Sequence, residues 1–153
     1  MSSTPVEARP NAEEVSDRLA LADLVACLAL ATDAGDWAAF VGCFAPGAGV
    51  DYGSLGAGPV EDIVQRLQES QAQYLGTMNV VGTHRVTLEG DRALAETYVV
   101  SHHFRQEGDS SWDDEAGTQY HDEFVRTAEG WRIARRVAEV RWFKSDPCAG
   151  GWL

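Results

Sequence analysis

From Val80 to Ala93 the chain reads Val-Val-Gly-Thr-His-Arg-Val-Thr-Leu-Glu-Gly-Asp-Arg-Ala, and this stretch decides the fold. Its strand-like character changes to a short turn at Glu89-Gly90-Asp91 and then resumes. An alternation of inward and outward residues is typical of β-strands, and a short glycine-containing turn between two such runs indicates a hairpin. The stretch therefore predicts two antiparallel strands, at about 77–89 and 92–106.

The same period of two continues towards the C-terminus. We predict further strands at about 117–128 and 131–144, joined by a hairpin turn at Ala128-Glu129-Gly130. Residues 107–115 are dense in acid and are predicted to form a solvated loop. Their spacing lacks the calcium-loop pattern, so a calcium site is disfavoured there.

Upstream of Gly76 the apolar residues follow a helical period. A long helix is predicted to begin at Asn11 and to stop at Gly35, because glycine commonly ends helices. A short helix over 37–44, a brief strand over 49–52 and a glycine-rich loop over 53–58 should follow. Pro59 then suits the start of a second long helix.

Helices followed by an antiparallel meander predict an α+β domain. A strongly twisted sheet wrapped against the N-terminal helices makes a cone-shaped α+β barrel, whose open end is a natural ligand cavity. We expect one domain over residues 11–145, preceded by a disordered N-terminus (1–10) and followed by an irregular tail (146–153), in which Trp152 could act as a lid.

The composition limits which classes of partner and chemistry are expected for this chain. The formal charge is -12, from 24 acidic and 12 basic residues, and such a field repels phosphate backbones, so nucleic acid is not expected to bind. The only lysine, Lys144, is a poor candidate for Schiff-base chemistry. Without a membrane-length apolar run or a secretory signal, a cytoplasmic protein is expected. The three cysteines lack metal-like spacing and suit reduced thiols.

Two ionisable residues about fifty positions apart are the candidate catalytic pair. Asp33 ends the first helix, and His84 falls on the apolar face of its strand together with Val86 and Leu88. A carboxylate that orients an imidazole makes a general base able to work near neutral pH. Taken singly, a helix-end aspartate often binds backbone N–H groups, and a strand histidine is often a hydrogen-bonded core residue.

Further candidates come from strand parity, the alternation by which every second residue of a strand shares one face. Of the adjacent His102 and His103, the second shares the small, mostly uncharged face of its strand and is expected to point inwards. Arg136 shares a face with Ala138, Val140 and Trp142, which suits an anion holder as well as a structural ion pair.

The face of His121, which it shares with Gln119 and Glu123, cannot be assigned as inner or outer from parity. A metal site is a competing prediction, because His84, His103, His121 and Glu123 could meet on one wall. No closely spaced histidine pair supports it, so neither a metal nor a cofactor is predicted. The aromatic residues Trp37, Tyr52 and Trp142 suit the core or the rim of a cavity.

Four motifs carry a family resemblance: Thr32-Asp33-Ala34-Gly35-Asp36-Trp37, Gly82-Thr83-His84, Glu89-Gly90-Asp91-Arg92-Ala93 and the segment 130–136. Over residues 12–144 the chain resembles the nuclear transport factor 2-like fold. More narrowly, it is similar to the SnoaL-like group that includes scytalone dehydratase and hexachlorocyclohexane dehydrochlorinase.

The resemblance implies an aspartate–histidine dyad at Asp33 and His84. It also implies active-site roles for Tyr52, His103 and Arg136. Thr32 departs from the dehydratase pattern, which has a tyrosine immediately before the aspartate, and Gln119 and His121 replace that enzyme's polar pair. The substrate and the dehydration reaction therefore stay open.

The sequence thus predicts a cofactor-independent lyase, most simply a dehydratase, in which His84 abstracts a proton from a small apolar cyclic or aromatic substrate. Tyr52, with His103 or Arg136, would polarise the substrate or protonate its leaving oxygen, while Trp37, Trp142 and His121 would complete the site. The alternatives are an isomerase or polyketide cyclase with the same base, and a binding or assembly module without turnover. Apolar residues on the outer strand face, among them Tyr98, also predict a homo-oligomer, a dimer or trimer.

Overall fold

The computed structural model describes residues 9–150 and shows the α+β architecture that the sequence predicts. The disorder expected for residues 1–8 and the lid role of Trp152 lie outside the described residues. The helical elements and strands follow in the order α1 (Ala12–Ala34), α2 (Trp37–Gly42), β1 (Phe44–Asp51), η1 (Gly53–Leu55), β2 (Ala57–Pro59), α3 (Val60–Gln71), β3 (Gly76–Glu89), β4 (Arg92–Glu107), β5 (Ser110–Thr127) and β6 (Gly130–Pro147).

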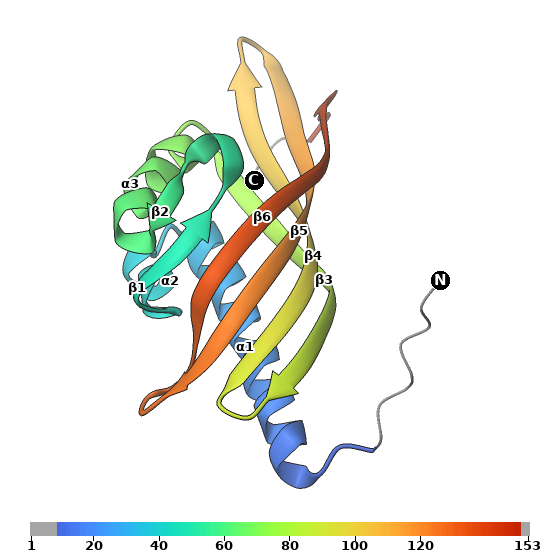
Figure 1. Cartoon of the computed structure of the whole chain (residues 1–153). Coiled ribbons are helices and arrows are strands. Elements are labelled where there is room, and N and C mark those ends of the chain that lie inside the picture. Colours follow the sequence, from blue (N-terminus) through green and yellow to red (C-terminus); the bar gives the residue numbers. More distant parts are fainter. Residues whose placement is uncertain (1–8, 151–153) are drawn as a thin grey trace.

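The strands form one curved, six-stranded sheet in the order β2-β1-β6-β5-β4-β3. All neighbours pair antiparallel except β1 and β6, which are parallel. Helix α1 runs across one face of the sheet, and α2 and α3 lie at one end beside β1 and β2 (Figure 1). We call the face that carries the helices the inner face, and the opposite one the outer face.

Local signals explain the long first helix. Asn11 accepts a hydrogen bond from the backbone N–H of Glu14 at 2.9 Å, and the Glu14 carboxylate accepts one from the Asn11 N–H at 2.8 Å, which together make a capping box. Gly35 ends the helix in the left-handed conformation, with φ 66°. The buried stripe of α1 packs on the sheet and contains Leu21, Val25, Leu28 and Ala31.

The acidic segment after β4 is ordered, contrary to the sequence prediction of a solvated loop over 107–115. The hairpin turns at Gly108, where φ is 59°, and β5 already begins at Ser110. Two of its acids are paired with basic residues of β4, since Asp114 contacts Arg105 at 2.8 Å and Asp113 contacts His102 at 2.7 Å. At the other end of the sheet β6 extends to Pro147, so the irregular tail begins later than predicted.

Two of the register shifts in the sheet, one in β3 and one in β6, decide how the predicted site residues face. In β3, Val81 pairs with Val99 but His84 pairs with Thr97, so one extra residue is accommodated between them. Gly82 suits this bulge because a Cβ there would meet the Tyr98 carbonyl oxygen at 3.3 Å. Before the bulge the odd-numbered residues face inwards, and after it the even-numbered ones do.

The second shift turns Trp142 to the outer face of β6. Thr118 pairs with Val140, whereas Gly117 pairs with Trp142. The indole lies against Gly117, where an added Cβ would come within 2.1 Å of Trp142 Nε1. The predicted common face of Arg136 and Trp142 is therefore wrong, because simple alternation does not continue through a bulge.

Candidate functional site

A cavity of about 250 Å³ opens between α1, α3 and the inner face of the sheet. Most of its wall is apolar and comes from the helices and from the inner residues of β3, β4 and β6. Polar side chains reach it from all four long strands. They are Thr77, Asn79, Ser101, His103, Thr118, Tyr120 and Arg136. An apolar cavity with a few convergent polar groups is typical of a small-molecule site.

One polar wall is organised by Asp33 at the end of α1. Its carboxylate accepts hydrogen bonds from Thr77 Oγ1 at 3.0 Å, from Asn79 Nδ2 at 2.6 Å and from the Asn79 backbone N–H at 2.9 Å. The Asn79 Oδ1 atom in turn accepts from Ser101 Oγ at 2.6 Å. Asp33 therefore fixes which side of the Asn79 amide faces each neighbour.

The hydrogen bond predicted between Asp33 and His84 is not formed, and this part of the sequence prediction is wrong. His84 Nδ1 lies 2.8 Å from Thr97 Oγ1 instead. The five residue steps from Asn79 to His84 correspond to roughly 15 Å along a strand, so the carboxylate that reaches Asn79 does not also reach His84.

His84 itself is held in a desolvated environment. Its Nε2 atom is buried and has no hydrogen-bond partner within residues 9–150. His84 does not line the cavity described above. Burial lowers the pKa of His84, the charge of Asp122 partly offsets this, and Arg136 adds to the lowering. The imidazole is therefore held as a neutral group.

Arg136 lines the cavity as one half of a buried ion pair. Its Nε and Nη2 atoms donate to Asp122 at 2.7 and 2.6 Å, and the side chains are 4% and 0% exposed. The guanidinium carbon lies 4.2 Å from the centroid of the Tyr120 ring. Although burial lowers its pKa, the nearby Asp122 and Tyr52 more than offset this and raise it, so Arg136 stays charged.

Tyr52 and Tyr120 form the aromatic side of the same region, with ring centroids 6.3 Å apart. Burial raises the pKa of Tyr52 strongly, and the charge of Arg136 only partly opposes this. Burial raises the pKa of Tyr120 in the same way. Both phenols therefore keep their protons at neutral pH and can donate hydrogen bonds.

His103, the histidine that parity selects, lines the cavity, whereas His102 points to the outer face. His103 Nδ1 lies 3.1 Å from the backbone carbonyl oxygen of Asp114, and its ring centroid lies 4.9 Å from that of Tyr74. A carbonyl oxygen only accepts, so Nδ1 carries a proton, and the tautomer that fits this contact has its lone pair on Nε2. His103 is thus the cavity residue best arranged to accept a proton.

Gln71 supplies an acceptor that has no partner within residues 9–150. Its Nε2 donates to the Thr32 carbonyl oxygen at 2.6 Å and to Thr77 Oγ1 at 3.1 Å, so the amide cannot turn over without placing two acceptors together. Its Oε1 atom is buried without a hydrogen bond from the described residues. Since Gln71 lines the cavity, the wall there contains a buried acceptor without a donor from the described residues.

The remaining predicted residues divide between the two faces. Trp37 lines the cavity, but Trp142 and His121 lie on the outer face. His121 is 41% exposed and lies 3.4 Å from Glu139, so its predicted role in substrate binding is wrong. The proposed metal wall is not assembled either, because His84 and His103 point inwards while His121 and Glu123 point outwards.

Parity alone missed the residues that Asp33 and Arg136 contact. Asn79 and Thr77 face inwards only because of the β3 bulge. In the sequence, the glycine within this strand, Gly82, was the signal that could have predicted the bulge. For Asp122 and Tyr120, the alternation along their strand did not show whether they face inwards or outwards.

Comparisons with known proteins agree with this architecture. The family model of the SnoaL-like domain matches residues 13–137. An uncharacterized protein of Mycobacterium tuberculosis (strain H37Rv) is 31% identical over 128 residues, which cover 81% of this chain and 85% of that protein.

Two solved structures share the fold at low identity. A hexachlorocyclohexane dehydrochlorinase of Novosphingobium barchaimii has a TM-score of 0.75 at 16% identity, over 90% of this chain and 94% of that one. A scytalone dehydratase-like protein of Novosphingobium aromaticivorans has a TM-score of 0.76 at 16% identity, over 86% and 88%. These identities bear on the fold alone, which is nuclear transport factor 2-like.

Proposed function

The chain belongs to the SnoaL-like domain family, and we propose that it is a cofactor-independent lyase of the dehydratase kind. Its substrate would be a small apolar cyclic or aromatic molecule that carries a hydroxyl group. The observation that carries this proposal is a proton acceptor, His103 Nε2, and a protonated phenol, Tyr52, on the wall of one mostly apolar cavity.

In this proposal the base is His103 rather than His84. His103 lines the cavity and has its tautomer set by the Asp114 carbonyl oxygen, whereas His84 does not line the cavity. His103 Nε2 takes a proton from a carbon next to an electron-withdrawing group, and the electron pair left on carbon forms the new double bond. The departing hydroxyl, polarised by a hydrogen bond from Tyr52, takes up the proton from His103 Nε2 and leaves as water, which returns the imidazole to its starting form.

Asp33 acts in the same proposal as a positioning residue. It accepts hydrogen bonds from Thr77 and from the Asn79 amide NH₂. Because this orients the Asn79 amide, its Oδ1 atom accepts a hydrogen bond from the Ser101 hydroxyl on the cavity wall. A rigid polar wall of this kind can orient a substrate without itself exchanging protons.

The substrate's own donor group would bind Gln71. A buried carbonyl oxygen without a partner favours a ligand that brings a hydroxyl or N–H group, because such a ligand satisfies it. The charged Arg136 is less available to a second anion, since Asp122 already neutralises it through two hydrogen bonds. These features favour a neutral hydroxylated substrate over a carboxylate.

Deuterium exchange tests the proposed base without knowledge of the natural substrate. The protein is incubated in D2O with a panel of cyclic and aromatic β-hydroxy carbonyl compounds, and carbon-bound deuterium and dehydrated product are followed by mass spectrometry. We expect His103→Gln to abolish exchange, whereas His121→Ala on the outer face should retain it. Ligands that bind the cavity but exchange no proton with the unaltered protein would instead support a binding module.

A further inference from the structure

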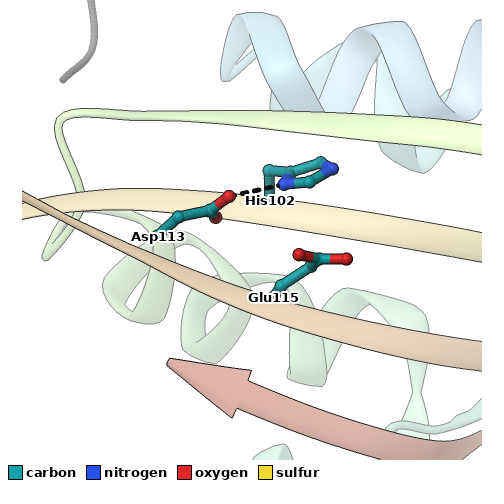
Figure 2. Close-up of side chains that lie close together, drawn as sticks. All are labelled: His102, Asp113 and Glu115. Atoms are coloured by element: carbon teal, nitrogen blue, oxygen red, sulfur yellow. Dashed lines mark hydrogen bonds and ion pairs between the residues drawn. The ribbon is translucent and has the colours of Figure 1, made fainter. Parts of the chain in front are cut away.

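A second group of ionisable side chains lies on the outer face of the sheet. His102 of β4 and Glu115 of β5 are directly opposite in the strand register, and Asp113 lies two positions from Glu115 on the same face. Figure 2 shows the three side chains gathered across the two strands, with His102 hydrogen-bonded to Asp113. Since His103 points inwards, this outer cluster is separate from the cavity.

The three side chains are close enough to share one ion. One ligand atom from each lies within 4.8 Å of the other two. Their side chains are 27%, 19% and 17% exposed for His102, Asp113 and Glu115, so each is largely removed from water. Partly desolvated carboxylates need compensation, which cations and metal ions supply.

Among the described residues, only one oxygen of the Asp113 carboxylate has a partner. Its Oδ2 atom lies 2.7 Å from His102 Nδ1, but its Oδ1 atom is buried and has no hydrogen-bond partner among residues 9–150. Lys144 is divided between Glu115 at 3.0 Å and Asp146 at 3.1 Å. A buried carboxylate oxygen without a partner is uncommon in native proteins, and a bound cation would satisfy it.

We propose that His102, Asp113 and Glu115 bind a first-row transition-metal dication, with Zn²⁺ as the representative ion. One imidazole nitrogen and two carboxylate oxygens suit zinc better than calcium or magnesium, which prefer sites made only of oxygen. Three protein ligands leave a fourth position for water.

The fit requires only small movements of side chains. Bonds of about 2.0–2.2 Å at a tetrahedral zinc place ligand atoms roughly 3.4 Å apart. The contact between His102 and Asp113 therefore has to open by about 0.7 Å, and Glu115 has to approach while Lys144 stays with Asp146. The ion would join β4 to β5 close to their hairpin turn at Gly108.

Titration calorimetry of the full chain, freed of metal with EDTA and then dialysed, tests the site with zinc chloride. We expect about one zinc per chain, and at least a tenfold weaker affinity after His102→Ala. Asp113→Asn and Glu115→Gln keep the side-chain shapes and should also weaken binding. His121→Ala is the matched control, because His121 lies on the same face within 3.8 Å of Glu96 and 3.4 Å of Glu139.

Cobalt substitution distinguishes this site from the cysteines, of which Cys27 is exposed. Cobalt at the proposed site should give visible absorption without the near-ultraviolet band of a cobalt–thiolate bond. Saturating zinc should also raise the Tm by roughly 5 °C or more in the unaltered chain and not in His102→Ala. Absence of zinc binding, binding unchanged by His102→Ala, or a thiolate band would each overturn the proposal.

Discussion

The buried pair of Asp122 and Arg136 should dominate the stability of the cavity wall. Asp122→Asn keeps the shape of the side chain but leaves the Arg136 guanidinium, which is 4% exposed, without its counterion. The mutation also weakens two hydrogen bonds of 2.7 and 2.6 Å. Removing one partner from a buried ion pair costs about 3–5 kcal/mol, because the remaining charge stays desolvated. We expect that loss in the free energy of unfolding.

Urea denaturation measures the loss directly, and thermal unfolding should show a Tm lower by roughly 6–20 °C for a chain of this size. The neighbouring pair of Glu123 and Arg135 is the control, because it joins the same two strands on the outer face. Its side chains are 46% and 61% exposed and 3.2 Å apart, so Glu123→Gln should cost about 0–1 kcal/mol. Equal losses for the two variants would refute the reasoning from burial.

Further outcomes follow from the same contacts. Because the pKa of His84 is lowered from 6.5, the unfolded chain binds more protons between the folded pKa and 6.5. Stability should therefore be complete above about pH 6.5 and fall below it, and His84→Gln should flatten this dependence in a Tm series from about pH 5 to pH 8. Asp33→Asn should cost about 1–3 kcal/mol in urea denaturation, because an amide NH₂ replaces an acceptor facing Thr77 or Asn79. Gln71→Met should weaken a hydroxylated cavity ligand about tenfold in calorimetry and leave its deoxy analogue unchanged. We expect a homodimer in light scattering, through the outer face where Tyr98 and Trp142 are 52% and 42% exposed, and Trp142→Arg should yield monomers.

Much of the fold could be predicted from local patterns. Asn11 and Gly35 mark the ends of the first helix, and the glycine turns at Gly90 and Gly130 separate long strands whose ends agree with the prediction within three residues, except for the start of β5. These features depend on neighbours in the chain, so a single sequence contains them. The β4–β5 hairpin is the exception, because two of its acids pair with Arg105 and His102 on the opposite strand.

For the cavity, parity correctly selected His103 over His102 and placed Arg136 on the inner face. The partners of the candidate residues could not be predicted in the same way. Asp33 binds Asn79, which the β3 bulge turns inwards, while His84 lies too far along the strand for Asp33 to reach. Trp142 lies on the outer face because β6 accommodates an extra residue between Val140 and Trp142.

The sequence by itself determined the order of the helices and long strands, most of their ends, the acidic charge and the type of fold. Only the tertiary structure decided which carboxylate meets which histidine, amide or arginine. Register is a collective property of paired strands, and a single inserted residue reverses the face of every side chain beyond it. In β3 that reversal placed Asn79 on the cavity wall, where Asp33 binds it.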